Sequence, residues 1–287
     1  ATLIVAEIGD DAFTDSFWFS AVEAEVYAIS SLFTALVFWA ILKWENIAHE
    51  KYSNRWLILI AYLMGLSIGV HLLNLLAIPA IVFVFYYKKY NVTRAGIIKA
   101  FVVSMIILGS IMYVIIPGLV KVASWFDLLF VNGFGLPFKS GVIFYIALLL
   151  GLIVWGLYYT SKKKQVILNT IILAITVIVI GYSSFAMIVI RSIANPPMDE
   201  NNPETVFNLL NYINREQYGS RPLFKGQYYN AQIVDSESPY TYRQKDGKYV
   251  KSYSLNDKYE YDERFTTIFP RMYSPQPDHI QEYKKWA

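Results

Sequence analysis

Six apolar stretches, separated by short polar segments, fill the first two thirds of the chain. They cover residues 18–42, 56–70, 72–87, 100–117, 140–160 and 166–190. A membrane-spanning helix needs roughly 20 apolar residues, with about 17 tolerated, so the second and third stretches are short. These two stretches form either a helical hairpin that turns at His71 or one broken element. The pattern predicts an all-α integral membrane bundle of about six spans in residues 1–191.

Beyond Arg191 the sequence becomes polar and rich in Tyr, which predicts a separate small α+β domain in residues 192–287. Asn202 as N-cap and Pro203 at the first helical position predict the start of an amphipathic helix that runs to Gly219. Farther along, Asp246-Gly247 stands between alternating Tyr-rich runs, which predicts a β-hairpin. We expect this tail to be extracytoplasmic.

Composition agrees with a membrane protein. Hydrophobic residues make up 55% of the chain and charged residues only 16%, and Cys is absent. The absence of Cys excludes disulfides and thiolate metal sites. No Walker loop, G-x-G-x-x-G or H-E-x-x-H motif occurs, so we expect no cofactor, no metal and no nucleic-acid partner. The apolar cores contain no Asp, Glu, Lys or Arg, which argues against ion-coupled transport.

Basic residues between the stretches indicate an orientation in the membrane. One set of loops carries most of them, and the opposite set carries only Lys121, Lys139 and Arg191. Because positively charged loops stay in the cytoplasm, the richer set is assigned there. Asp10–Phe17, His71, Leu119–Lys139 and everything after Arg191 are assigned to the outside. The basic loops alternate consistently between the two sides of the membrane only if residues 56–70 and residues 72–87 each cross it. The cytoplasmic set is Lys43, Lys51, Arg55, Lys88, Lys89, Arg94, Lys99, Lys162, Lys163 and Lys164.

Both ends of the sequence suggest a piece of a longer protein. Ala1 is not an initiator Met, and no charged segment precedes the short apolar run that follows it. The last residues, HIQEYKKWA, end without Gly, Pro or a cap, as if a helix continued. We therefore expect truncation at the N-terminus of the membrane domain and at the C-terminus of the tail.

Two carboxylates at the start of the first stretch are the leading catalytic candidates. If the helix begins near Thr14 or Asp15, Glu23 and Glu25 lie at the external membrane boundary. Residues i and i+2 of a helix point about 200° apart, so at most one of the two faces a given site. Glu25 shares a face with Trp18 and is flanked by Tyr27, which favours Glu25 as a base that orients a hydroxyl. The alternative is an interfacial Glu that simply meets water.

The segment GLSIGVHLLNLLAIPA supplies further candidates. Gly65 and Gly69 form a G-x-x-x-G pattern, which lets another helix approach closely. Pro79 is expected to kink the return helix. His71 and Asn74 place polar groups at the external turn, where they bind substrate or are simply solvated.

Arg191 and the tail tyrosines each allow two interpretations. At the external end of the last stretch, the guanidinium of Arg191 is an interfacial anchor or a ligand for a lipid phosphate. The tyrosines form a surface that stacks on sugar or peptide, or they are ordinary strand residues. They are Tyr228, Tyr229, Tyr240, Tyr242, Tyr249 and Tyr253.

Four segments together resemble a bacterial multi-span family, long listed as of unknown function and typical of Bacteroidetes. They are TDSFWFSAVEAEVYAISSLFTALVFWAILKWE, GLSIGVHLLNLLAIPAI, NPPMDENNPETVFNLLNYINREQYG and DERFTTIFPRMYS. A eukaryotic relative of that family is a protein O-mannosyltransferase of the secretory pathway. The fold that this resemblance implies is similar to the C-type glycosyltransferases.

The resemblance implies a membrane glycosyltransferase that moves a sugar, mannose above all, from a polyprenyl-phosphate donor to Ser or Thr of secreted or periplasmic proteins. It places the protein in the bacterial inner membrane with a periplasmic tail. The usual catalytic acid of that superfamily would lie before Ala1, so Glu25, His71 and Asn74 would form the remaining wall of the site. Arg191 would stabilise the leaving phosphate. A non-enzymatic membrane scaffold or transporter with a partner-binding tail is the alternative.

Overall fold

The computed structural model describes residues 26–199, 202–216, 222–253 and 258–286. The chain divides into two compact units, the first formed by Ala1–Ala123 and Ile143–Pro196, the second by Ser124–Val142 and Pro197–Ala287. Residues 124–142 thus group with the tail, although they lie between two apolar stretches in sequence. The domain boundaries expected from the sequence stay a prediction.

The described parts of all six apolar stretches are mainly helical, as predicted. Five helices are long and apolar enough to cross a membrane, among the described residues. The helix over the second stretch has 15 residues, about 22 Å, and falls short of the roughly 30 Å of hydrocarbon. The number of crossings and their orientation stay predictions. The elements are α3 (Tyr27–Asn46), α4 (Asn54–Ile68), η1 (Leu72–Ala77), α5 (Ile78–Lys89), α6 (Arg94–Gly109), η2 (Ser110–Ile115), α7 (Ile116–Leu128), η3 (Leu129–Gly133), α8 (Ser140–Lys162), α9 (Val166–Tyr182), η4 (Ser183–Phe185) and α10 (Ala186–Ile193).

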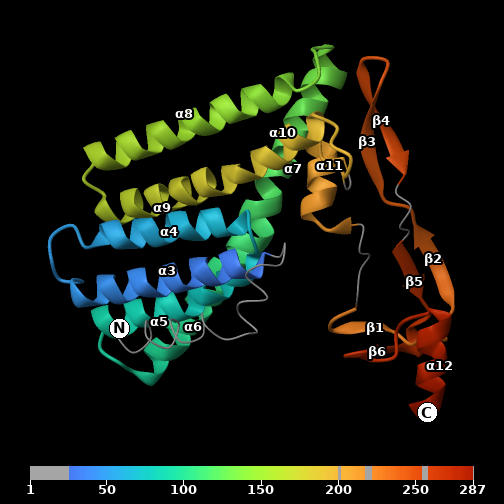
Figure 1. Ribbon diagram of the computed structural model, residues 1–287, viewed down its shortest axis with the longest axis horizontal. Helices are drawn as coiled ribbons and strands as arrows, with labels where there is room; N and C mark the ends of the chain where they lie inside the picture. Colours follow the sequence, from blue (N-terminus) through green and yellow to red (C-terminus); the bar gives the residue numbers. More distant parts are fainter. Residues whose placement is uncertain (1–25, 200–201, 217–221, 254–257, 287) are drawn as a thin grey trace. The chain divides into compact units, whose positions relative to one another are not determined.

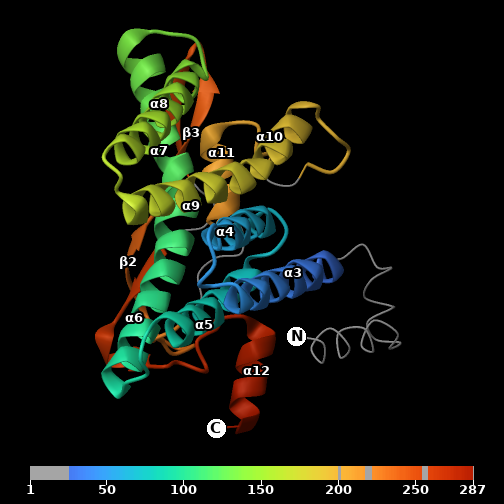
Figure 2. The ribbon, with the colours of Figure 1, turned by 90° about the vertical axis from the view of Figure 1, so that its left-hand side faces the viewer.

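The short helix α4 is packed between α3 and α9, as Figures 1 and 2 both show. The contact between α4 and α9 is close because glycine has no side chain. A Cβ at Gly65 would lie 2.5 Å from the carbonyl oxygen of Ile178 on α9. Reciprocally, a Cβ at Gly181 would lie 2.5 Å from the carbonyl carbon of Gly65. A Cβ at Gly69 would collide with the hydroxyl oxygen of Ser184. The close approach predicted for Gly65 and Gly69 is therefore confirmed.

The first described helix, α3, begins at Tyr27, and Val26 before it lies in a bend. The helix start predicted near Thr14 or Asp15 lies outside the described residues. The hydrophobic pattern continues through this bend, which is why periodicity alone missed it. Residues 1–25 lie outside the described part of the chain.

A 40-residue helical element, Arg94–Gly133, replaces the expected span over 100–117 and the external loop that was to follow from Leu119. Figure 2 shows its length along α6 and α7. The helix continues through Pro117, which has no N–H to donate to the preceding turn. The π-helical turn η2 lies directly before α7, and its wider turn accommodates the missing hydrogen bond. At about 60 Å, this element is longer than the roughly 30 Å of hydrocarbon in a bilayer.

The expected turn between α4 and the return helix is present, but Pro79 does not kink that helix. The chain leaves α4 at Gly69, runs through the 3₁₀ segment η1, and changes to α-helix at Ile78. Pro79 occupies the first turn of α5. The missing N–H of proline has no helical partner to lose there, so Pro79 begins the helix.

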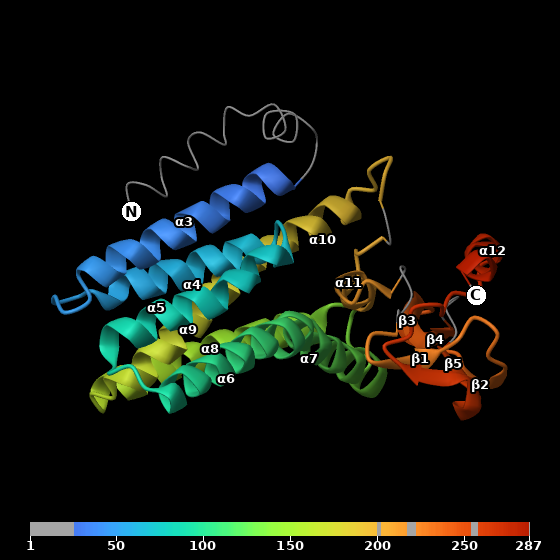
Figure 3. The same cartoon turned by 90° about the horizontal axis from the view of Figure 1, so that it is seen from below.

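The second unit contains three antiparallel strand pairs, which Figure 3 shows gathered in the tail. The predicted hairpin is confirmed: Lys245 pairs with Lys248 around Asp246 (φ 49°) and Gly247 (φ 75°), the two left-handed residues of a tight turn. The strands are β1 (Lys225–Gln227) with β6 (Thr266–Ile268), β2 (Ile233–Glu237) with β5 (Lys258–Tyr261), and β3 (Tyr240–Lys245) with β4 (Lys248–Tyr253). The helices are α11 (Val206–Ile213) and α12 (Pro277–Trp286), with a 3₁₀ turn at Glu263–Phe265.

The amphipathic helix of the tail exists, but its ends differ from the prediction. Thr205, not Asn202, is the N-cap: its backbone is extended and its hydroxyl accepts the N–H of Asn208 at 3.2 Å. Asn202 takes a left-handed φ of 39°. The helix ends at Ile213 instead of continuing to Gly219. Asn and Thr are both favoured caps, so residue type alone does not decide between them.

Candidate functional site

Three of the residues selected from the sequence lie outside the described residues. They are Glu23, Glu25 and Trp18. Their roles stay predictions. The remaining candidates are Tyr27, His71, Asn74 and Arg191.

Tyr27 and His71 lie against each other at one end of the first unit. Their ring centroids are 5.8 Å apart with planes tilted by 51°. Tyr27 begins α3, and His71 caps η1 with an extended backbone. The Nδ1 atom of His71 accepts the N–H of Leu73 at 3.1 Å. A neutral imidazole in this arrangement carries its proton on Nε2, so His71 presents an N–H donor away from the helix.

Asn74 is buried between η1 and α3, with 3% of its surface exposed. Its Oδ1 accepts hydrogen bonds from the hydroxyls of Ser30, at 3.3 Å, and Thr34. Its Nδ2 is buried and has no hydrogen-bond partner within the described structure. A buried donor without a partner costs about 1–3 kcal/mol, so a ligand oxygen there would be favourable.

Arg191 is separate from these residues in the contacts that the structure describes. It lies in the last turn of α10 with its side chain exposed. No salt bridge joins it to any described carboxylate. The structure therefore brings together Tyr27, His71 and Asn74, and it does not connect Arg191 to them by a hydrogen bond.

Ser30 and Thr34 are polar residues of this cluster that the sequence analysis missed. They are spaced i and i+4 on α3, so they share one face of that helix. This spacing was a usable signal, but small hydroxyl residues are common in apolar helices and often bond to their own backbone.

Asp127 is the other missed residue. It was assigned to an external loop, yet it lies in α7 and is fully buried. Its Oδ1 accepts the N–H of Gly141 at 3.1 Å and its Oδ2 accepts the N–H of Lys139 at 3.3 Å. The carboxylate thus caps the start of α8, where the helix dipole favours negative charge. A Cβ at Gly141 would collide with the backbone of Phe126 and Asp127, so only glycine permits this approach.

Tyr249 completes this second cluster, which lies within the second unit. Its hydroxyl donates to Asp127 Oδ2 at 2.6 Å, and its backbone exchanges two 2.8 Å hydrogen bonds with the side-chain amide of Asn132. The rings of Phe138 and Phe207 pack against it edge to face. Burial raises the pKa of Tyr249, and the hydrogen bond to Asp127 raises it further. This cluster is structural: it anchors the β3–β4 hairpin to η3.

Among the six tail tyrosines, the structure separates core from surface. Tyr249 is buried, and Tyr242 packs beside it against Phe207. Tyr240 and Tyr253 are 51% and 70% exposed. Strand packing accounts for Tyr249 and Tyr242. The six tyrosines together therefore do not form one stacking surface.

Metal-binding side chains do not gather in the part of the chain that the structure describes. No three His, Asp or Glu side chains converge there. The expectation of a site without a metal or cofactor stays a prediction.

Comparison with known proteins gives two family matches. Residues 219–287 match a family of unknown function, DUF8416. No curated protein and no solved structure matches the chain. Residues 9–94 match the model for the N-terminal domain of protein O-mannosyl-transferase TMEM260. The region that holds Tyr27, Ser30, Thr34, His71 and Asn74 is therefore similar to that N-terminal domain.

Proposed function

We propose that this protein is part of a membrane glycosyltransferase that transfers mannose from a polyprenyl-phosphate donor to Ser or Thr hydroxyls of proteins outside the cytoplasm. The observation that carries the proposal is the match of residues 9–94 to the N-terminal domain of a protein O-mannosyl-transferase. Membrane-length apolar helices support a reaction at the bilayer, where a lipid-linked donor resides.

The Tyr27–His71–Asn74 cluster suits the polar end of such a donor. His71 offers Nε2–H and Asn74 offers a buried Nδ2 group without a described partner. Phosphate oxygens and sugar hydroxyls both accept hydrogen bonds, so either would satisfy these donors. Tyr27, 53% exposed, presents an aromatic face beside them.

The reaction exchanges one carbon–oxygen bond for another. The acceptor hydroxyl oxygen attacks the anomeric carbon while the bond from that carbon to the phosphate oxygen breaks, and the phosphate leaves with the electron pair. Glu25 takes the hydroxyl proton in this proposal, as a general base. Arg191 is proposed to stabilise the phosphate charge as the donor is released.

The decisive experiment uses membranes from cells with and without the full-length protein, supplied with polyprenyl-phosphate [³H]mannose. Label that enters protein and is released by mild alkali, which cleaves O-glycosyl Ser and Thr by β-elimination, would support the proposal. Equal labelling of the two membrane preparations would contradict it. A non-enzymatic scaffold or transporter gives that second result.

Glu25→Gln keeps size and hydrogen bonding but removes the charge. We expect unchanged expression and at least about a 10²-fold loss of transfer, the low end for a positioned base. Glu23→Gln should be much milder. Normal transfer by Glu25→Gln would remove that residue from the site.

His71→Phe and Ser30→Ala separate donor binding from packing. His71→Phe keeps a ring against Tyr27 but removes the N–H, so the KM for the lipid donor should rise about tenfold. Ser30→Ala removes only a hydrogen bond to Asn74 and should leave that KM within about twofold. Equal KM values for both variants would mean that His71 only packs.

A further inference from the structure

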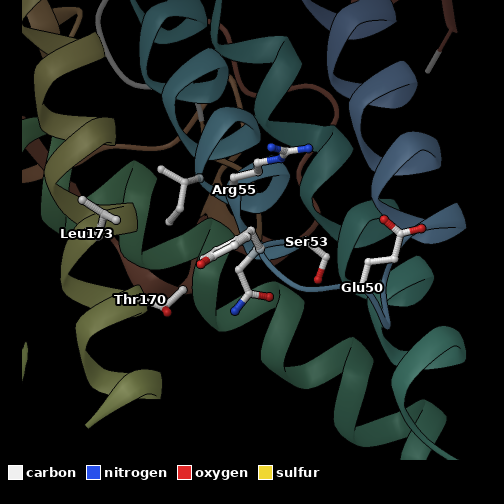
Figure 4. A pocket seen from close by; sticks show the side chains of 8 residues that line it. Glu50, Ser53, Arg55, Thr170 and Leu173 are labelled. Atoms are coloured by element: carbon white, nitrogen blue, oxygen red, sulfur yellow. The ribbon is translucent and has the colours of Figure 1, made fainter. Parts of the chain in front are cut away.

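A cavity of about 380 Å³ opens between the α3–α4 loop and α9, inside the first unit. Its lining includes Glu50 and Arg55 from the loop and start of α4, and Leu173 from α9 (Figure 4). It lies at the N-terminal end of α4, whereas His71 follows the C-terminal end. Since α4 has 15 residues, the two ends are about 22 Å apart. The cavity is therefore distinct from the site proposed for sugar transfer.

Two opposite charges face this cavity without neutralising each other. Glu50 and Arg55 form no salt bridge with one another or with other described residues. In Figure 4 the carboxylate of Glu50 and the guanidinium of Arg55 lie apart from each other. The hydroxyl of Ser53 donates to the carbonyl of Ala48 at 3.2 Å. A ligand with a negative and a positive group would therefore match the cavity.

Neighbouring lysines are already engaged, which distinguishes Arg55 from them. Lys43 lies 5.9 Å above the ring of Trp39, and Lys51 lies 5.0 Å above the ring of Tyr52. Lys89 donates to the carbonyl of Ala48. Arg55, in contrast, is exposed and has no such contact within the described residues. Its guanidinium is suited to a bidentate phosphate contact.

The remaining lining is apolar on the side of the helices. Ile58 and Leu173 lie one turn farther into α4 and α9 than the polar residues Asn54 and Thr170. The cavity thus changes from polar to apolar along the helix direction. Trp and Tyr together with Lys at this end of the helices are typical of headgroup depth in a bilayer. A polar head attached to an acyl chain has the same gradient.

We propose that this cavity binds a phospholipid whose headgroup carries both a phosphate and an amine, as in an ethanolamine phospholipid. Arg55 contacts the phosphate, and Glu50 contacts the ammonium. Ile58 and Leu173 cover the first part of the acyl chains. The lipid holds the α3–α4 loop against α9.

Native mass spectrometry of the full-length protein in detergent tests this proposal. The probes are an ethanolamine phospholipid and a glycerol-headgroup phospholipid with the same acyl chains. We expect the wild type to bind the ethanolamine lipid more tightly. Arg55→Gln should weaken both lipids about tenfold, because both lose a charged phosphate contact. Lys99→Gln, which removes an equal charge outside the cavity, should bind both lipids as the wild type does.

Glu50→Gln gives the discriminating result. It should weaken the ethanolamine lipid and strengthen the anionic glycerol lipid, a gain that misfolding cannot produce. Weakening of both lipids by Glu50→Gln, or equal binding by Arg55→Gln and Lys99→Gln, would overturn the site. Soluble phosphoethanolamine should not compete at the lipid's concentration. Competition would show that the cavity takes a free headgroup compound, and the lipid assignment would be wrong.

Discussion

At the scale of single residues, the best-defined interaction of this protein joins Asp127 and Tyr249, which are far apart in sequence. The buried carboxylate has three donors: two backbone N–H groups at the start of α8 and the tyrosine hydroxyl. A buried carboxylate is stable only when its oxygens are satisfied, so each donor matters. The contact fixes both the helix start and the hairpin.

Tyr249→Phe removes one of these donors while keeping the ring. We expect the free energy of unfolding of the tail to fall by about 1.5–3 kcal/mol, the usual value of a hydrogen bond to a charged group. Limited proteolysis of the full-length protein in detergent measures the change as faster cleavage in β3 and β4. The control is Tyr253→Phe, because Tyr253 is 70% exposed. The same cleavage rate for both variants would contradict the assignment.

Stability in alkali depends on the same residue. Since the pKa of Tyr249 is raised in the folded protein, the neutral phenol is favoured there. Its contribution is complete below the pKa of an unfolded tyrosine, about 10, and is lost as the pH rises above that value. The thermal midpoint of the wild type should therefore fall between about pH 9 and about pH 11 by more than that of Tyr249→Phe. Parallel falls in the two proteins would exclude this linkage.

At the scale of elements, glycines determine how closely helices approach. Gly65 and Gly181 let α4 and α9 meet backbone to backbone. Gly151 in α8, in contrast, has no neighbouring atom within 4 Å of an added Cβ. Identical residues in apolar helices therefore have different roles.

Gly65→Leu and Gly151→Leu test this difference as a matched pair. Gly65→Leu forces α4 from α9, and overpacking of this kind costs about 1–3 kcal/mol or more. We expect less folded protein by size-exclusion chromatography in detergent. Gly151→Leu should leave the yield close to that of the wild type. Equal yields for both would mean that the α4–α9 contact is dispensable.

At the scale of the whole molecule, the chain forms two units whose boundaries do not follow sequence order. Residues 124–142 are grouped with the tail because Val131 and Phe138 share a core with Phe207 and Tyr249. The last quarter of the long helix, the start of α8 and the tail thus fold together. The charge pattern places this region outside the cytoplasm, which is still a prediction.

Reporter fusions test the orientation. A reporter that is active only outside the cytoplasm should be active when fused after Pro197 and inactive after Lys164, since positively charged loops stay inside. A third fusion after Gly135 should be active like the first. The reverse pattern would move every proposed site to the other side of the membrane.

The sequence predicted the helices over the described parts of the six stretches, the hairpin at Asp246-Gly247 and the close approach of Gly65. Each of these rests on local periodicity, turn chemistry or side-chain size. It did not predict the bend before Tyr27, the passage of the long helix through Pro117, or the N-cap at Thr205. In each case two local arrangements have similar energies, and neighbouring turns or packing select one.

Of the candidate site, the sequence by itself determined that polar residues stand at the turn around His71. Only the tertiary structure decided that His71 meets Tyr27 and that Asn74 is buried against Ser30 and Thr34. It also decided that Asp127 is buried and not in a loop. The physical reason is the same for all three. The hydrophobic pattern depends on neighbours along the chain. Burial of a polar group depends on partners beyond the same helix, such as Thr34 for Asn74, 40 residues away, and Tyr249 for Asp127, 122 residues away.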